Sequence, residues 1–505
     1  MREQNVETSQ EITVLARGAG IVFIGTLFGL ILKYIFQLIV ARHLGAQLFG
    51  AFFLGVTIFS ILERLSGLGL PNGIVRFVSV FRGQGDQERI KGTILTGLRF
   101  VSVVGLPLLF TTVLLSSILA NRVFNDMNLV WVLRILAVGG FFSGLSEILV
   151  FTTQAFQVMQ YKVWVRFVFE PILRIVLVWL GFWLGWRLFG ATLAFTIASV
   201  SGTALAFVFM LKVFPAFKEK RVVPRYETKA IMQFSWPLFF VGSFNLVLVY
   251  ASTLLLGYFR ESHEVGIFGA AFRTAMLMAV VLESFNAIFS PMIADLANRQ
   301  EIKKVGELFK VVTKWIFTIS FPVFLVMVLF PRMILDLWGK DFASGAACLI
   351  LMSCAQLINC GVGSSGYMLM MTGHTKIILL NSLFLFAMTI GLSVYLIPEH
   401  GMLGAALSYA IPIGLINIVR LVEVYIILGI HPYRWDFLKP LTAGLSALVV
   451  AWIVNNFVLI DHHLVFLAVN IFAVALTYGL VLVVLRIPQE DRIVLDKIKL
   501  KLFTR

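Results

Sequence analysis

The chain has 505 residues, of which 59% are hydrophobic and only 13% charged, and its formal net charge is +15. Soluble domains carry roughly a quarter charged residues, so this composition excludes a water-soluble fold. Apolar runs of about 20 residues, enough to cross a membrane as helices, recur along the whole length, whereas β-barrel strands alternate polar and apolar residues. The sequence therefore predicts an all-α polytopic membrane protein.

The excess of positive charge could indicate a nucleic-acid ligand or a membrane topology. Most of the 41 lysines and arginines fall in segments on the same predicted side as the N-terminus. Basic residues gather in this way in cytoplasmic loops. We therefore expect a multi-pass protein of the cell (cytoplasmic) membrane with cytoplasmic N- and C-termini, and no nucleic-acid partner.

About fourteen transmembrane helices are predicted, in three groups. Six helices form an N-terminal lobe at 1–213, and a cytoplasmic connection at 214–229 leads to a second six-helix lobe at 230–428. An appended helix pair at 437–486 and a basic cytoplasmic tail at 487–505 follow. The expected spans lie near 15–41, 46–70, 93–119, 129–156, 162–186, 188–212, 230–257, 264–292, 309–331, 343–371, 376–397, 402–428, 437–458 and 463–486.

Charged side chains inside these spans are the candidate functional residues, because a charge in hydrocarbon is costly unless it is paired or hydrated. Cations outnumber acids, so a water-filled cavity with this balance would suit an anion. Arginine forks match phosphate oxygens, which favours a lipid-linked phosphate or pyrophosphate. The cations are Lys33, Arg64, Arg134, Arg174, Arg273, Lys314 and Arg420, and the acids are Glu63, Glu147, Glu170, Glu283 and Glu423.

Each of these candidates also has a structural interpretation. Lys33 could extend to the outer interface, and Glu170, four residues from both Arg166 and Arg174, could simply neutralise them. Near the end of the twelfth span we expect a local ion pair between Arg420 and Glu423.

A stretch near the middle of the chain, Gly266–Asp295, repeats one near the N-terminus. Phe49–Phe53 opens an apolar run that carries Glu63 and ends at Pro71, and Phe268–Phe272 opens one that carries Glu283 and ends at Pro291. Six spans separate the copies, so they share one orientation and form a parallel pseudo-repeat. Two such lobes can expose a site between them to alternate sides of the membrane.

The chain resembles polysaccharide flippases of the multidrug/oligosaccharidyl-lipid/polysaccharide (MOP) superfamily, the group that contains O-antigen and lipid II flippases. The residues that carry the resemblance are Ala41–Gly45 with Phe49–Gly50, Gly67–Leu70 before Arg76, Val265–Arg273, and Leu396–Ala406. The resemblance implies a V-shaped pair of six-helix lobes, with spans 1, 2, 7 and 8 around a cationic cavity.

The expected function is therefore a flippase that moves a polyprenyl-(pyro)phosphate-linked oligosaccharide between leaflets by alternating access. Arg273 is the first candidate for a headgroup contact by its place in the motif, with Lys33, Arg64 and Arg174 behind it. Glu63, Glu283 and Glu170 are candidates for coupling to H⁺ or Na⁺, and helix-crossing hydrogen bonds are the alternative for Glu63 and Glu283. We expect a monomer among membrane lipids, near glycan polymerases or transferases, with no catalytic residues, cofactor or metal site.

Two other functions stay open. A cation-coupled multidrug antiporter of the same superfamily would use membrane carboxylates, although the forms with a first-span aspartate are disfavoured because spans 1 and 7 contain no acid. A membrane glycan polymerase or glycosyltransferase would need a sizeable external loop, and each predicted external loop is short.

Overall fold

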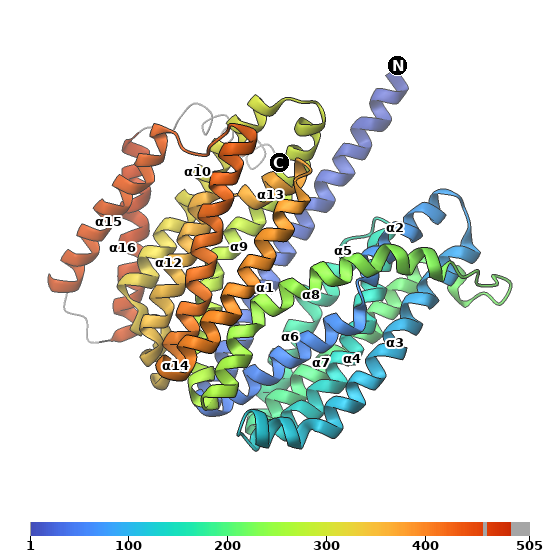
Figure 1. The fold of residues 1–505 in the computed structure, drawn as a ribbon, viewed down its shortest axis with the longest axis horizontal. Helices are drawn as coiled ribbons and strands as arrows, with labels where there is room; N and C mark the ends of the chain where they lie inside the picture. The colour runs from blue at the N-terminus through green and yellow to red at the C-terminus, as the bar shows by residue number, and fades with distance from the viewer. Residues whose placement is uncertain (1, 458–461, 486–505) are drawn as a thin grey trace. The chain divides into compact units, whose positions relative to one another are not determined.

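The fold of this computed structural model consists of helices (Figure 1). The structure describes residues 2–457 and 462–485, and it describes their side chains except those of residues 2–24 and 240–249. Among the described residues there is no strand, so the predicted all-α class is confirmed. The predicted tail at 487–505 lies outside the described residues. The first helices are α1 (Arg2–Gly67), α2 (Leu70–Gly83), α3 (Gln87–Ile118), η1 (Leu119–Val123), α4 (Asn128–Ala155), α5 (Gln160–Val163), η2 (Trp164–Phe169), α6 (Glu170–Trp183), α7 (Arg187–Val213), η3 (Pro215–Lys218) and α8 (Thr228–Phe259).

The rest of the described chain, up to the C-terminal pair of helices, is also helical. They are α9 (Ser262–Asn298), α10 (Ile302–Leu329), α11 (Pro331–Asp336), η4 (Lys340–Gly345), α12 (Ala346–Val362), α13 (Ser365–Met371), α14 (Thr375–Leu428), η5 (Trp435–Phe437), α15 (Leu438–Phe457) and α16 (His463–Val484).

Ten stretches of the described chain are helical, long and apolar enough to cross a membrane. Two of them, at Gly25–Gly83 and Thr375–Leu428, are 59 and 54 residues long and each hold two of the predicted spans. The remaining two predicted spans correspond to α5–η2–α6, which a π-helical segment interrupts, and to α8, whose side chains are described only in part. These helices account for the predicted set of about fourteen spans.

Two glycines turn the chain between consecutive spans inside α1 and α14. Gly45 has φ 72° and ψ 173°, and Gly401 has φ 55° and ψ −130°, conformations that favour a residue without a Cβ atom. At the second turn the carboxylate of Glu264 accepts a hydrogen bond from the backbone N–H of Met402 over 2.7 Å. The break in each helix is therefore fixed by backbone geometry, and the second also by a side-chain cap.

Replacing Gly401 with alanine is expected to lower the thermal stability of the purified protein. A Cβ atom there would meet the Glu264 carboxylate and force an unfavourable φ, a strain of about 1–3 kcal/mol. Gly391, in the same helix, has open space where a Cβ would stand, so Gly391→Ala is the matched control. Melting of both variants in detergent checks this, and equal melting temperatures would contradict the role of Gly401.

The described helices form two compact units. The first comprises Met1–Ala270, Leu337–Phe342 and Phe386–Ser408, and the second Ala271–Asp336, Ala343–Leu385 and Tyr409–Arg505. In the first unit α4 lies at the centre and packs on α1, α3 and α7. In the second unit α10 packs on α12 and α15, and α15 pairs with α16. The predicted lobe limits, 1–213 and 230–428, remain a prediction.

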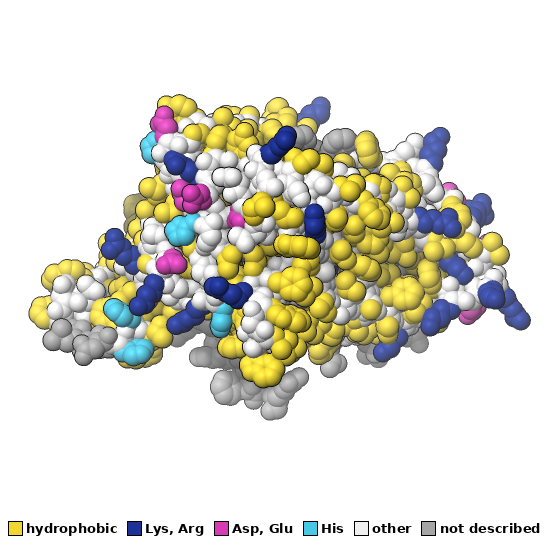
Figure 2. Space-filling view, turned by 90° about the horizontal axis from the view of Figure 1, so that it is seen from below, with side chains coloured by type: hydrophobic (Ala, Val, Ile, Leu, Met, Phe, Trp, Pro, Cys, Tyr) yellow, Lys and Arg dark blue, Asp and Glu magenta, His cyan; other side chains and the backbone are white. Residues whose placement is uncertain are grey.

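Large apolar side chains cover much of the outer surface, as expected where lipid is the solvent. Figure 2 shows hydrophobic side chains over much of one face, with lysines and arginines gathered in places between and beside them. The tryptophans at 179, 183 and 186 stand exposed near the turn between α6 and α7. Tryptophan concentrates where the hydrocarbon meets the headgroups, so this turn marks one membrane interface.

Candidate functional site: a buried ion-pair network in the first unit

Acidic and basic side chains from four helical segments meet inside the first unit. Glu63 comes from the second part of α1, Glu147 from α4, Arg166 from η2, and Glu170 and Arg174 from the start of α6. α1 packs on η2 and α6, and α4 packs on α1 and α5, which brings these segments together. The network contains four of the charged candidates from the sequence: Glu63, Glu147, Glu170 and Arg174.

Arg166 is the centre of this network. Its Nη2 atom lies 3.0 Å from Glu63 Oε1 and 2.9 Å from Glu147 Oε2, and its Nη1 atom lies 3.2 Å from Glu170 Oε1. The guanidinium also donates to the hydroxyl of Ser143 over 2.8 Å and to its carbonyl oxygen over 3.0 Å. One arginine fork thus makes five close contacts, to three carboxylates and to two oxygens of Ser143, which is more than the three N–H donors of a lysine could supply.

Arg174 and Glu170 form the most deeply buried part of the network. Arg174 Nη2 lies 3.0 Å from Glu170 Oε2, and the guanidinium carbon lies 3.7 Å from the centre of the Phe195 ring. Ser199 Oγ is 3.4 Å from the same Nη2 atom. Both side chains are almost wholly enclosed, with exposed fractions of 10% and 3%. Glu170 therefore bridges the two arginines, as the spacing of four residues predicts.

The π-helical turn η2 has a local cause in the sequence. Pro171 lacks an N–H and cannot donate to the carbonyl oxygen of Phe167 four residues before it, which disfavours a regular α-helical turn at this point. Gly29 of α1 packs against the backbone of Phe167, where a Cβ atom would not fit. Lys33, one turn further along α1, places its Nζ atom 4.5 Å from the centre of the Phe167 ring. This close approach brings Lys33 to the edge of the network.

The other candidate residues lie outside this network. Arg64 is exposed and, among the described residues, forms no ion pair, although it is the neighbour of Glu63. Arg273 is half-buried in α9, in the second unit. Glu283 is exposed on the same helix and accepts a hydrogen bond of 3.4 Å from the hydroxyl of Tyr367. Glu63 and Glu283, matched by the repeat, thus have different surroundings.

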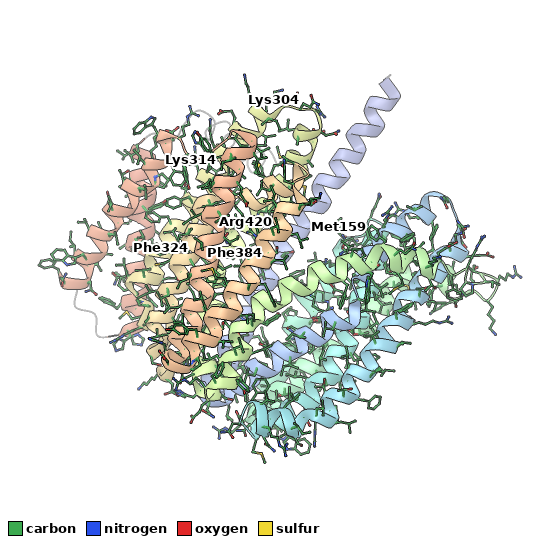
Figure 3. All side chains as sticks on the ribbon, viewed as in Figure 1. Met159, Lys304, Lys314, Phe324, Phe384 and Arg420 are labelled. Carbon is green, nitrogen blue, oxygen red and sulfur yellow. The ribbon has the colours of Figure 1, made fainter. Side chains whose placement is uncertain are left out.

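The predicted local ion pair of the twelfth span is wrong. Among the described side chains, no ion pair joins Glu423 to Arg420, which is labelled in Figure 3, although the two charges still interact. Instead, Glu423 accepts a hydrogen bond of 2.6 Å from the side-chain amide of Asn381, which lies earlier in α14. Residues three positions apart on a helix can form an ion pair. The carboxylate can instead accept from a neutral donor when that donor lies closer, on a neighbouring segment.

The sequence did not predict that Arg166 is the common partner of the carboxylates of the network, or that Ser143 belongs to the site. Ser143 and Glu147 stand four residues apart on α4, and this polar stripe in an apolar helix was the available signal. No spacing rule links α4 to η2, so the partners themselves could not be predicted.

The family of the chain is shown by its sequence, and its fold is shared with solved structures. Residues 15–297, more than half of the chain, match the family model described as polysaccharide biosynthesis protein. The chain belongs to this family. A search of curated proteins found no match.

Solved structures of MOP transporters share the fold. The lipid II flippase MurJ in an inward closed conformation aligns with a TM-score of 0.72 and 16% identity, over 91% of this chain and 97% of that one. A multidrug resistance MATE family transporter in its inward-facing conformation gives 0.66 and 16%, over 80% and 94%. A MOP superfamily transporter from Pyrococcus furiosus, whose description notes a binding pocket of reverse polarity, gives 0.58 and 16%, over 82% and 95%.

Proposed function

We propose that this protein translocates a polyprenyl-(pyro)phosphate-linked oligosaccharide from the inner to the outer leaflet of the cell membrane, for the assembly of a surface polysaccharide or glycan. The observation that carries the proposal is membership of the polysaccharide biosynthesis protein family. The MOP fold supports it, because a transporter of this fold can alternate access without covalent chemistry. Both termini would face the cytoplasm.

Arg273 and Lys33 are the proposed contacts of the phosphate groups, with Arg64 as a further cation. An exposed or half-buried cation can meet an anionic headgroup, and Lys33, Arg64 and Arg273 have that accessibility. Arg174 is enclosed by Glu170 and Phe195, so its proposed contribution is to hold Glu170 in place.

The proposed coupling residues are Glu63, Glu170 and Glu283, with H⁺ or Na⁺ as the coupling ion. Glu63 shares the Arg166 guanidinium with Glu147 and Glu170, so protonation of one carboxylate changes the charge that the other two experience. If transport in sealed vesicles is unaffected by proton and sodium gradients, this part of the proposal fails.

A cation-coupled multidrug antiporter is the second candidate. It is favoured by one observation, the three glutamates gathered around Arg166, because exchange of cations for protons or sodium uses carboxylates within the membrane. A glycan polymerase or glycosyltransferase is less favoured, because the solved structures that share the fold are a flippase and transporters.

A strain that lacks the gene separates these functions. Accumulation of lipid-linked oligosaccharide facing the cytoplasm is the expected result for a flippase. Normal glycans together with hypersensitivity to cationic drugs would favour the antiporter. Unpolymerised oligosaccharide that has already reached the outer leaflet would favour the polymerase.

A further inference from the structure

Two aromatic side chains from the turn between α11 and α12 pack into the first unit. The segment Leu337–Phe342 belongs to that unit, whereas the residues on either side, up to Asp336 and from Ala343, belong to the second. A tryptophan near the end of a membrane helix is typically found at the interface with the headgroups. Trp338 and Phe342 are instead fully buried, each with an exposed fraction of 0%. We call these two side chains together the aromatic latch.

The aromatic latch is held by side chains of α1 that lie on both sides of the turn at Gly45. The indole N–H of Trp338 donates to the hydroxyl of Tyr34 over 3.2 Å, and the two rings meet edge to face with their centres 5.3 Å apart. The ring of Phe49 lies 5.8 Å from that of Trp338 and 5.7 Å from that of Phe342. Tyr34 precedes Gly45 and Phe49 follows it, so the latch contacts two consecutive spans.

A hydrogen bond and close backbone contacts join the start of α9 to the same end of α1. The hydroxyl of Ser262 donates to the carboxylate of Asp126 over 2.5 Å, and both side chains are buried. Gly50 lies so close to the backbone of Ser262 that a Cβ atom there would not fit, and Gly266 lies equally close to the backbone of Ala46. The backbones of α1 and α9 therefore touch here, with no side chain and no room for water between them.

All of these contacts lie at one end of the predicted spans. With both termini in the cytoplasm, as in the proposed function, the turn at Gly45, the loop of Asp126, the start of α9 and the aromatic latch are on the outer side. The segment Phe386–Ser408, which contains the turn at Gly401, has the same orientation and also belongs to the first unit. Outer ends of helices from both predicted lobes are therefore packed within one unit.

We propose that the aromatic latch holds the outer end of the transport pathway closed, and that the pathway opens outward when Trp338 leaves its place beside Tyr34 and Phe49. Two inserted aromatic rings stabilise the closed form because they remove apolar surface from water, and this stabilisation exists only while they are inserted. The hydrogen bond between Ser262 and Asp126 is a second, weaker tie. The direction of opening rests on the proposed function, but the latch does not depend on which lipid is transported.

The test measures how fast a cysteine at the closed outer end reacts with a membrane-impermeant maleimide. Ala46 is suited to this because its exposed fraction is 1% and it lies where α1 touches α9. The reporter is Ala46→Cys in the full chain, with the three native cysteines replaced by alanine and the protein in lipid nanodiscs. It should react slowly. Adding Trp338→Ala should speed labelling by about tenfold or more, and tenfold corresponds to about 1.4 kcal/mol in the opening equilibrium.

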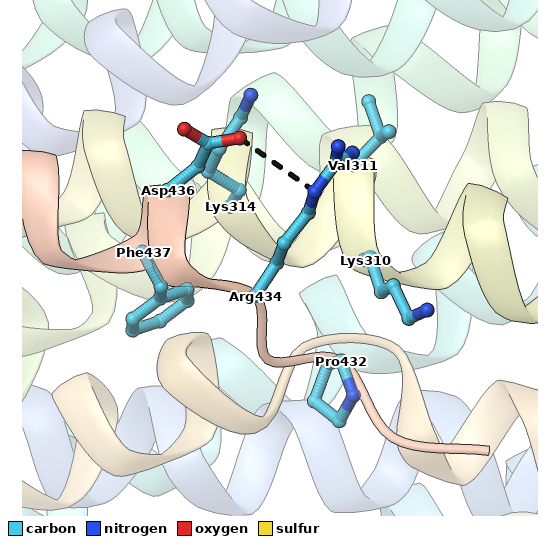
Figure 4. A pocket seen from close by; sticks show the side chains of 7 residues that line it. All are labelled: Lys310, Val311, Lys314, Pro432, Arg434, Asp436 and Phe437. Carbon is cyan, nitrogen blue, oxygen red and sulfur yellow. Dashed lines mark ion pairs between the residues drawn. The ribbon is translucent and has the colours of Figure 1, made fainter.

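A second reporter and a control variant separate opening from damage to the fold. Ser146 is fully buried on α4, and its hydroxyl has no hydrogen-bond partner among the described residues, so Ser146→Cys should be tolerated. This cysteine should stay unlabelled with or without Trp338→Ala. Phe437, labelled in Figure 4, belongs to the second unit and packs on Phe317 with ring centres 4.6 Å apart. Phe437→Ala also truncates a packed ring, but it should leave labelling at position 46 unchanged.

Three results would overturn the proposal. The first is equal labelling at position 46 with and without Trp338→Ala. The second is a rise at position 146 as large as that at position 46, because the whole unit would then have opened. The third is a larger effect of Ser262→Ala than of Trp338→Ala, since the hydrogen bond would then be the main tie. Labelling needs no substrate, so a failure to move lipid-linked oligosaccharide would count against the proposed function and not against the latch.

Discussion

Replacing Arg166 with leucine is expected to destabilise the protein more than any other single change in the first unit. The substitution leaves Glu63, Glu147 and Glu170 close together without the guanidinium that they share. Removing one partner of a buried pair costs about 3–5 kcal/mol, because the remaining charge is uncompensated. Glu63 and Glu147 keep some contact with solvent, with exposed fractions of 24% and 33%, so about 3 kcal/mol is expected. Thermal melting in detergent measures the effect.

The control for this prediction is Arg187→Leu, which removes an exposed arginine at the start of α7. Its melting temperature should stay close to that of the unaltered protein. Adding Glu63→Gln to Arg166→Leu should restore part of the lost stability, because one unpaired charge disappears. A network that contributes nothing would give equal melting temperatures for R166L and R187L, and no recovery in the double variant.

The same network shows which parts of the site a sequence can reveal. The pair Glu170–Arg174 follows from a helical spacing of four residues, and this prediction is confirmed at 3.0 Å. The pair Glu63–Arg166 joins residues 103 positions apart and depends on how α1 packs on η2. Local periodicity carries no information about such a contact, so the sequence could identify the charges but not their common partner.

The fold could be predicted from the sequence better than the site could, because the hydropathy of a whole segment decides whether it spans the membrane. A helix needs about 20 apolar residues to cross a membrane, and this requirement marks most spans directly. The interruption at η2 depends on one proline and on the close packing of Gly29, details that an averaged hydropathy does not register. Likewise, the predicted repeat aligns Glu63 with Glu283 in sequence, yet of these two described residues only Glu63 lies in an ion-pair network. Two copies of a repeat place matching residues at the same positions along their helices, but the side chains around those residues can differ.

Replacing Arg273 with glutamine is expected to reduce translocation by about 10- to 100-fold while leaving folded protein in the membrane. A hydrogen bond between a charged group and a phosphate contributes about 1.5–3 kcal/mol, which corresponds to this range of rates if the contact forms during transport. Glutamine keeps much of the length and polarity of the side chain but removes its charge. The measurement is the transport of a fluorescent or radiolabelled lipid-linked oligosaccharide across the membrane of reconstituted vesicles into a form that an added lectin can bind.

The matched control lies at the end of the same helix. Arg299 is exposed and pairs with Asp295 over 3.0 Å, so Arg299→Gln removes a charge of the same sign away from the membrane interior and should transport normally. Arg273→Lys should recover part of the activity, because it restores the charge but not the planar fork that holds two phosphate oxygens. If R273Q and R299Q transport equally well at equal expression, Arg273 does not contact the headgroup. If R273Q is inactive and R273K fully active, charge alone is required, and attraction of the anionic headgroup rather than two-point recognition is the role of this residue.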